Sequence, residues 1–368
     1  MTVAMEPKAG RFLFVHSAGG WGLGEYVRCV TLARELVRRR PDAQVRILCS
    51  RAAPRLPDDP FEHIEVDGQP SRNAPAFAAL LRSWRPDVAV FYSTGRRTML
   101  RDARAAGVRV VYAASRDTAL HRALRGLTPR YLDELWRVQR RLGERDVALP
   151  LWTRTKMRLL GSATVRTFDA IAPAPDPSAR LAVRRELGLG DAPYALFAPG
   201  GGGWSLDGRS IGEVFAESAR QTQSASGMRC VAVLGPLAPP RTDATCGAPR
   251  SDLPVLVREL GLVAMNELIA GAEAVAVTGG GICCQALLHG TPCVAAAVGD
   301  DDQPERVKRW GADHLLVPTE PDAEKIAHEM IALLRDPERR SSLRANAAAR
   351  GPRNGLSAAI DRLEALAS

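Results

Sequence analysis

The chain lacks an apolar run that approaches a membrane span, which takes about 20 residues, so a membrane-spanning protein is not expected. Residues 1–10 are polar and precede an apolar segment directly, so no targeting segment is visible; we expect a flexible N-terminus and a cytoplasmic protein. The seven cysteines have no metal-ligand spacing, and their odd number argues against a secreted disulfide scaffold. Aromatic residues make up 5% of the chain, and no zinc or base-stacking pattern indicates a nucleic-acid partner.

Positive charge is concentrated in one segment. Residues 96–166 contain 16 arginines and one lysine against six acidic residues, an excess that is larger than the net +9 of the whole chain. Such a segment attracts an anionic membrane, nucleic acid or an anionic acceptor. The alternative, an arginine-rich composition on solvated helix faces, stays open. We therefore expect, as a hypothesis, peripheral contact with an anionic membrane through residues 96–166.

The length of 368 residues suits two domains rather than one. In the first half, apolar segments alternate with amphipathic ones, which predicts a parallel sheet covered by helices on both faces. The expected strands are residues 11–15, 44–49, 64–66, 87–92, 108–113 and 167–172. The expected helices are residues 26–40, 74–84, 100–106 and 118–145.

A proline-spaced segment, residues 173–177, predicts a connector, and a second alternating series follows it. Strands are expected at 194–198, 230–234, 274–277 and 294–298, with 255–259 extended or helical, and helices at 211–223, 265–270, 304–310, 320–335 and 356–367. We predict an α/β fold of two doubly wound Rossmann-like domains facing each other across a cleft. They span residues 11–175 and 176–352, and residues 353–368 form a closing helix.

The most informative stretch runs from Val275 to Val294 and is followed by a polar loop, Gly299–Gln303. It predicts a buried strand, a glycine turn, a short helix and a second strand. A glycine turn that ends a parallel strand and opens a helix exposes backbone N–H groups beside the positive end of the helix dipole, which favours phosphate binding. A second run, Gly200–Gly203, follows another expected strand. Alone it indicates only a loop, but the two runs in one sheet favour a diphosphate site.

This unit resembles the donor half of sugar-nucleotide glycosyltransferases of the GT-B type. The likeness rests on Gly279–Gly281, Gln285, Gly290–Pro292 and the pair Asp302 and Gln303. The resemblance is greatest to two families, the peptidoglycan N-acetylglucosaminyl transferase and the UDP-sugar hydrolase of pseudaminic acid synthesis. The resemblance to the lipopolysaccharide heptosyltransferases is weaker. These families usually have a glutamate that grips the ribose where Gln285 stands, and an amide loses the charge-assisted part of that hydrogen bond.

The resemblance implies a role for each part of the second domain. The implied donor-binding residues are Gly201, Gly202, Gly203, Ser205, Gly280 and Gly281 for the diphosphate, Val263 and Met265 for the nucleobase, Gln285 for the ribose, and Asp302 and Gln303 for the sugar. Simple helix packing is an equally good explanation for Val263 and Met265. We expect no cofactor and no metal at Asp300–Asp302, because backbone amides and helix dipoles take the place of Mg²⁺ in this fold.

The loop Ser17–Glu25 resembles the glycine-rich loop of the same families, with Gly20, Trp21 and Gly22 expected on the acceptor side. Glu25 stands where those families have a histidine, and its carboxylate could accept a proton from an acceptor hydroxyl or from water. The alternative is that Glu25 only favours the helix N-terminus electrostatically. His16 and Asp117 are lesser catalytic candidates.

The sequence thus predicts a metal-independent glycosyltransferase. It would move a sugar from a nucleoside diphosphate sugar, such as a UDP-sugar, to a hydroxyl or amine of a small-molecule or lipid-linked acceptor. Two alternatives stay open: a nucleotide-sugar hydrolase with water as acceptor, and a non-catalytic protein that binds sugar nucleotides or polyanions.

Overall fold

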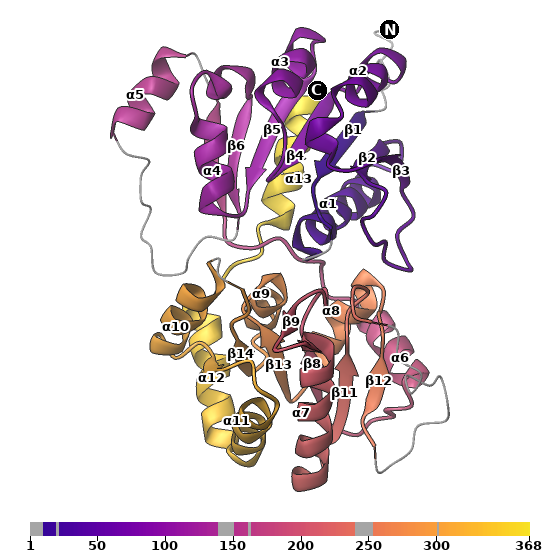
Figure 1. Cartoon of the computed structure of the whole chain (residues 1–368), viewed down its shortest axis with the longest axis vertical. Helices are drawn as coiled ribbons and strands as arrows, with labels where there is room; N and C mark the ends of the chain where they lie inside the picture. The colour runs from indigo at the N-terminus through magenta and orange to yellow at the C-terminus, as the bar shows by residue number, and fades with distance from the viewer. Residues whose placement is uncertain (1–9, 20–21, 139–150, 161–162, 240–252, 300–301) are drawn as a thin grey trace, which may run out of the picture.

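Two parallel sheets form the centres of two domains that lie one above the other (Figure 1). A computed structural model describes residues 10–19, 22–138, 151–160, 163–239, 253–299 and 302–368. We call the seven-stranded sheet with the helices packed on it the first domain, and the six-stranded sheet with its helices the second domain. The prediction of two doubly wound α/β domains is confirmed.

The first sheet has the strand order β3-β2-β1-β4-β5-β6-β7 among the described residues, with every pair parallel. Its strands are β1 (Arg11–His16), β2 (Gln44–Ser50), β3 (Glu62–Val66), β4 (Val88–Tyr92), β5 (Arg109–Ala114), β6 (Glu134–Val138) and β7 (Thr164–Phe168). The helices between them are α1 (Gly24–Arg39), α2 (Ala74–Ser83), α3 (Arg97–Ala105), α4 (Asp117–Leu124) and α5 (Leu151–Leu159), with short 3₁₀ turns at Pro70–Arg72 and Thr128–Tyr131.

The second sheet has the order β12-β11-β8-β13-β14-β15, again parallel throughout. Its strands are β8 (Tyr194–Ala198), β11 (Arg229–Val233), β12 (Val255–Val257), β13 (Ala274–Thr278), β14 (Cys293–Ala296) and β15 (Val317–Thr319), and β9 (Ser205–Leu206) with β10 (Arg209–Ser210) forms a separate hairpin. The helices are α6 (Pro177–Glu186), α7 (Ile211–Ser226), α8 (Leu262–Gly271), α9 (Gly281–Leu288), α10 (Gln303–Ala312), α11 (Ala323–Arg335), α12 (Pro337–Arg350) and α13 (Leu356–Ala367).

The central strands of each sheet, such as β4, β8 and β13, are apolar at every position or nearly so and are buried on both faces, whereas the edge strands β3 and β7 are more polar and only partly buried. In the first domain Phe12 and Phe14 pack with α1 and α13 on one face, and Leu13 packs with α2 and α3 on the other. In the second domain Leu196 packs with α8 and α9, whereas Phe197, the next residue, packs with α7 and α11. The alternation of side chains along a strand therefore supplies two cores to each sheet.

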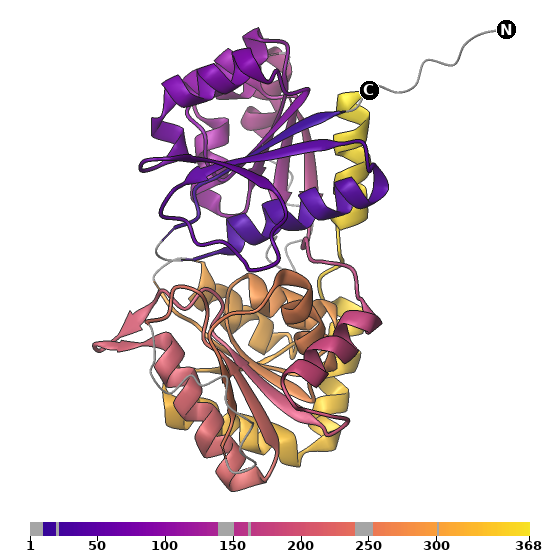
Figure 2. The same ribbon diagram turned by 90° about the vertical axis from the view of Figure 1, so that its right-hand side faces the viewer.

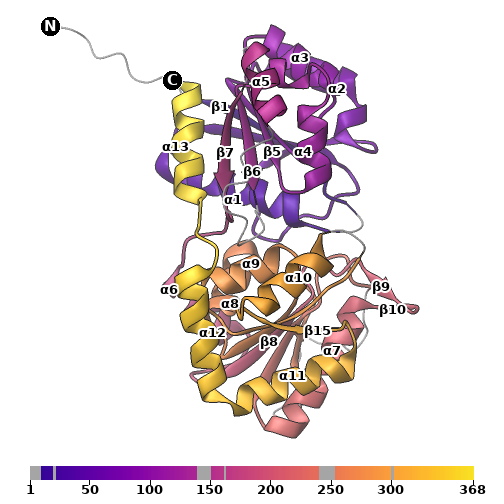
Figure 3. The same ribbon diagram turned by 90° about the vertical axis from the view of Figure 1, so that its left-hand side faces the viewer.

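The chain crosses between the domains twice, and the crossings lie side by side (Figures 2 and 3). Asn354 Nδ2 donates to the Ala172 carbonyl oxygen at 2.9 Å, and the Gly355 N–H donates to the Ala170 carbonyl at 2.8 Å. After the second crossing, α13 packs beside α1 of the first domain with Ile360 fully buried. The last helix in the sequence thus completes the core of the first domain.

The predicted helix over residues 118–145 is wrong. The structure has α4 over its first turns, a glycine in the left-handed region at Gly126 (φ 57°), a 3₁₀ turn, and then the buried strand β6, while residues 139–145 lie outside the described part. Strand β6 contains Glu134, which is 1% exposed and accepts hydrogen bonds from Trp136 Nε1 at 2.7 Å and Arg362 Nη2 at 2.7 Å. A charged residue suits a buried strand only when the fold supplies such partners.

Other boundaries also differ from the prediction. The strand expected at 167–172 is β7, which ends at Phe168, and residues 170–172 instead belong to the first crossing. Residues 255–259, left open between an extended and a helical conformation, form strand β12. Helices α5, α6 and α12 and strands β9, β10 and β15 were not predicted from the sequence.

Candidate functional site

A cavity of about 860 Å³ lies between the two domains. Its walls are the loops that follow β1, β4 and β5 in the first domain, those that follow β8, β11 and β13 in the second, and the start of α10. In each sheet the strand order reverses beside this cavity, between β1 and β4 and between β8 and β13. Doubly wound sheets bind ligands at such switch points, at the carboxyl ends of the strands.

The two glycine turns that the sequence singled out follow adjacent strands. Ala198 of β8 pairs with Val277 of β13, and Thr278 Oγ1 donates to the Pro199 carbonyl oxygen at 3.0 Å. The prediction that both runs end strands of one sheet is confirmed. Gly280 and Gly281 line the cavity at the start of α9, where the first N–H groups of a helix have no partner within the helix.

Only part of the second glycine run, Gly200–Gly203, lines the cavity. Gly201 lines the cavity, whereas Gly202, Gly203 and Ser205 are not among its lining residues. Gly202 has a φ of 77° and approaches the chain after β11 so closely that a Cβ would lie 2.3 Å from a backbone oxygen. The Ser205 hydroxyl donates to the Arg209 carbonyl at 3.1 Å within the hairpin. The structure thus gives Gly202 a packing reason to be glycine.

Of the remaining donor-binding candidates, some line the cavity and one does not. Met265 and Gln285 line the cavity, and Val263 on α8 does not. Asp302 and Gln303 line it at the start of α10. These four residues come from three different helices, so only the tertiary fold brings them to one cavity.

Asp302 is held by a buried cation. Its carboxylate pairs with Arg306, which is 4% exposed and whose Nη1 also donates to the Gly279 carbonyl at 2.7 Å. The Gln303 Oε1 is buried and has no hydrogen-bond partner among the described residues.

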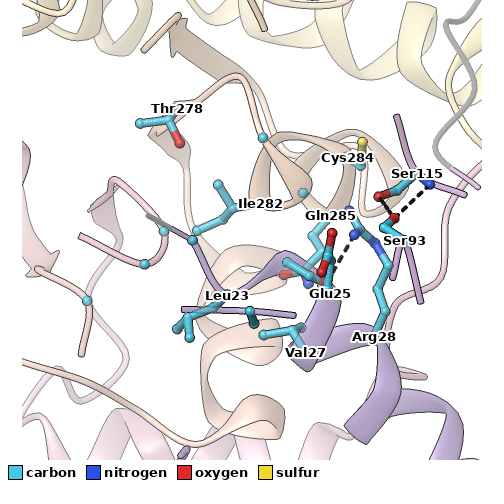
Figure 4. Close-up of a pocket in the computed structure, with 18 of the residues that line it drawn as sticks. Leu23, Glu25, Val27, Arg28, Ser93, Ser115, Thr278, Ile282, Cys284 and Gln285 are labelled. Atoms are coloured by element: carbon cyan, nitrogen blue, oxygen red, sulfur yellow. Dashed lines mark hydrogen bonds between the residues drawn. The ribbon is translucent and has the colours of Figure 1, made fainter. Parts of the chain in front are cut away.

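On the opposite wall, Glu25 is the second residue of α1, is 8% exposed and lines the cavity (Figure 4). Its Oε2 accepts hydrogen bonds from the Ser17 hydroxyl at 2.9 Å and the Ser17 N–H at 3.3 Å. Gly22 also lines the cavity, and its Cα lies 3.4 Å from the position that a Cβ on Gly201 would take. The glycine loops of the two domains therefore approach each other. Gly20 and Trp21 lie outside the described residues.

The other two catalytic candidates do not line the cavity. His16 is fully buried at the end of β1, where its Nδ1 accepts from the Ala18 N–H at 3.2 Å and its ring lies 5.4 Å from that of Tyr26. Burial lowers the pKa of His16 to about 3, so the ring is neutral near pH 7. Asp117 is exposed in the first turn of α4.

Arg28, Ser93, Ser115 and Arg122 are among the polar residues of the first-domain wall to which the sequence assigned no role. Ser93 and Ser115 come directly after the apolar strands β4 and β5. The rule that ligands sit at carboxyl strand ends could have found both serines. Arg28 lies one turn after Glu25 on α1, which is a weaker signal.

A hydrogen bond joins the domains beside the cavity. Asp58, in the loop between β2 and β3, accepts from the Leu262 N–H at 3.0 Å and pairs with Arg34 at 3.0 Å. Leu262 begins α8 and lines the cavity, and the preceding N-cap residue, Gly261, has no side chain to cap the helix. The first domain thus supplies the missing cap of a second-domain helix.

No protein-family model matches the chain, and no curated protein matches it in sequence. Solved structures do match. UGT2 of Phytolacca americana, complexed with UDP-2-fluoro-glucose and pterostilbene, has 14% identity and a TM-score of 0.59, over 96% of this chain and 95% of that one. The glycosyltransferase VinC in complex with dTDP has 16% identity and a TM-score of 0.56, over 97% and 99%. The glycosyltransferase SnogD from Streptomyces nogalater has 17% identity and a TM-score of 0.53, over 98% and 100%.

At these identities the likeness shows the fold: the chain has the two-domain GT-B architecture that the sequence predicted. Among the described residues, none of the helices combines the length and apolar character of a membrane span. Within the same part of the chain, no three His, Cys, Asp or Glu side chains are grouped closely enough to bind a metal ion. Asp300 and Asp301 of the Asp-x-Asp segment lie outside it.

The buried His16 predicts a pH dependence of stability. The unfolded chain protonates this residue below about pH 6.5 and the folded chain only near pH 3, so folding stability falls as the pH decreases between these values, by at most about 1.4 kcal/mol per pH unit. The His16→Gln variant should lose this contribution. Urea unfolding between pH 7 and pH 4 measures it, with His121→Gln, exposed on α4, as the control. Equal slopes for the wild type and His16→Gln would contradict the prediction.

Proposed function

We propose that the protein transfers a sugar from a nucleoside diphosphate sugar to a hydroxyl or amine of an acceptor. One observation carries this proposal: two glycine turns on adjacent parallel strands, one of which opens α9, meet at the interdomain cavity. Backbone N–H groups at such a place hold a diphosphate. The names of the structures that share the fold, which include a UDP-sugar and a dTDP complex, support the nucleotide part of the proposal.

In this proposal the second domain binds the donor. The diphosphate lies against Gly201, Gly280 and Gly281, and the nucleobase near Met265. The ribose lies near Gln285. Val263, Gly202, Gly203 and Ser205 then support these residues from outside the cavity. Oriented N–H dipoles neutralise the charge that develops on the leaving diphosphate, and each such donor contributes about 3 kcal/mol to catalysis.

The first domain binds the acceptor in the same scheme, and Glu25 is the base. The acceptor oxygen or nitrogen forms a bond to the anomeric carbon while the bond from that carbon to the diphosphate oxygen breaks, and the acceptor proton passes to Glu25. The two hydrogen bonds from Ser17 fix the direction of the carboxylate. Asp302 and Gln303 bind hydroxyls of the transferred sugar. The scheme needs no metal ion.

Hydrolysis of the donor by water is the alternative for the same site, because a fold does not choose between reactions. A donor sugar nucleotide incubated alone distinguishes them. Transfer predicts slow release of free sugar that is replaced by product when an acceptor is added, whereas hydrolysis predicts full turnover without one. A non-catalytic binding protein predicts binding without turnover under either condition.

Donor binding is the first test of the proposal. At least one of UDP, GDP, ADP, CDP and dTDP should raise the Tm of the protein. The Gly280→Ala variant should weaken the binding about tenfold, because the added methyl group would stand where the diphosphate contacts the turn. This position tolerates a Cβ in the fold, since the nearest atom is 3.9 Å away.

Gly22→Ala is the matched control, because it adds a methyl group to the opposite wall with no atom within 4 Å. It should leave nucleotide affinity unchanged. If all five nucleotides leave the Tm unchanged, the proposed donor site is wrong.

The role of Glu25 gives a second test. Glu25→Gln keeps the shape of the side chain but removes the base, so kcat should fall by about 10² to 10⁴ while nucleotide affinity stays within error. Glu35→Gln, near the other end of α1, is the control, because Glu35 bonds Arg38 and Arg39 and does not line the cavity. Unchanged turnover in Glu25→Gln would remove Glu25 from the mechanism.

Contact of residues 96–166 with an anionic membrane is part of the proposal for lipid-linked acceptors. Helix α5 supports it, because Leu151, Trp152 and Leu159 are 77%, 67% and 82% exposed on a short helix in the basic segment. Apolar side chains in a basic segment suit the surface of an anionic bilayer.

The protein should sediment with phosphatidylserine vesicles and not with phosphatidylcholine vesicles, and Trp152→Ser should weaken binding to the phosphatidylserine vesicles. Equal binding to both vesicle types would contradict the contact.

A further inference from the structure

The first-domain wall of the cavity carries more positive than negative charge. Its described charged residues are Arg28, Arg116 and Arg122 against Glu25 alone. The two buried arginines that line the cavity, Arg28 and Arg306, differ in their ion pairing. Arg306, in the second domain, is paired with Asp302, whereas Arg28, which is 6% exposed, forms no ion pair with any described carboxylate.

The surroundings of Arg28 are unfavourable for a cation. Its Nη1 donates to the Gly24 carbonyl oxygen at 3.0 Å, so the guanidinium lies at the N-terminus of α1, next to the positive end of the helix dipole (Figure 4). The ring of Tyr92, 5.7 Å away, gives partial compensation. The Glu25 carboxylate, one turn earlier, receives its hydrogen bonds from Ser17. A buried cation without a counterion is costly, and a bound anion would remove that cost.

Further donors line the same wall. Arg122 Nη1 donates to the Ser93 carbonyl oxygen at 2.9 Å. The Ser93 hydroxyl lies 3.0 Å from that of Ser115, and both serines line the cavity. Ser93 has a φ of 50°, a left-handed conformation that is strained for a residue other than glycine. Two arginines and two hydroxyls thus come together at the carboxyl ends of β4 and β5 and the start of α1.

We infer that Arg28, with Arg122, Ser93 and Ser115, binds an oxyanion group of the acceptor, a phosphate or a carboxylate. The planar guanidinium donates two parallel hydrogen bonds to either group, and hydroxyls can donate to the remaining oxygen atoms. This inference rests on the proposed function and names the chemical class of its acceptor. The anchored anion holds the acceptor against the wall that carries Glu25, and such positioning lowers the entropic part of the barrier.

The test is a calorimetric titration with inorganic phosphate, and separately with acetate, of protein saturated with the nucleoside diphosphate that binds most tightly. The bound nucleotide occupies the second-domain amides, so the titration reports the first-domain wall. The better of the two probes identifies the oxyanion. Arg28→Gln should weaken its binding about tenfold or more, and Arg28→Lys should weaken it less, because lysine keeps the charge but not the paired donors.

Variants of two exposed arginines distinguish a specific oxyanion site from a nonspecific effect of positive charge. Arg122→Gln and Arg130→Gln remove the same charge, and only Arg122 lines the cavity. Arg122→Gln should weaken phosphate binding several-fold, and Arg130→Gln should not change it. Because Arg122 is exposed, this pair stays informative if Arg28→Gln does not fold. Without phosphate, the Tm of Arg28→Gln should not lie below that of the wild type, whereas a purely structural Arg28 predicts a lower value.

The measured outcomes distinguish failure of this inference from failure of the proposed function. If a nucleotide binds but neither probe does, the inference is wrong and the proposed function stands. An equal loss in Arg122→Gln and Arg130→Gln also overturns the inference, because it indicates a general charge effect. If no nucleotide binds, the proposed function fails; phosphate binding to the nucleotide-free protein that is lost in Arg28→Gln would then still support the anion site.

Discussion

The structure depends on one constraint: both parallel sheets direct their carboxyl strand ends toward the same cavity. In the second sheet this places the glycine turns after β8 and β13 next to each other, and the hydrogen bond from Thr278 to the Pro199 carbonyl joins them. The start of α9 then opens toward the cavity with its first N–H groups. In the first sheet the same arrangement brings the ends of β1, β4 and β5 to the opposite wall. A site of this kind needs two sheets, because each supplies only one wall.

Contacts between the domains keep the two walls together. Asn354 bonds one crossing to the other at Ala172, and α13 returns the end of the chain to the core of the first domain. On the other side of the interface, Asp58 caps α8 across the boundary. Residues far apart in the sequence therefore determine the shape of one cavity. The buried arginines of the cavity also differ in their pairing: Arg306 pairs with Asp302 one turn away, whereas Glu25, one turn before Arg28, accepts its hydrogen bonds from Ser17.

The sequence predicted best the elements that local chemistry determines. Strands such as Val88–Tyr92 are apolar at every position and buried throughout, and the helix expected at 356–367 matches α13 residue for residue. It failed at β6, which lies in the basic stretch of residues 118–145 that was expected to be helical. The partners of Glu134 include Arg362, more than 200 residues away, and no local pattern contains that information.

By itself the sequence determined the alternation of strands and helices and the two glycine turns in one sheet, because both follow from periodicity and from the backbone freedom of glycine. Only the tertiary structure decided which candidates reach the cavity. It placed Glu25, Met265 and Gln285 on its walls, and buried His16 in the first domain. It also buried Arg28 without an ion pair to a carboxylate of the described residues. Burial and pairing depend on distant segments that meet only after folding, and this is the physical reason why sequence alone could not decide them.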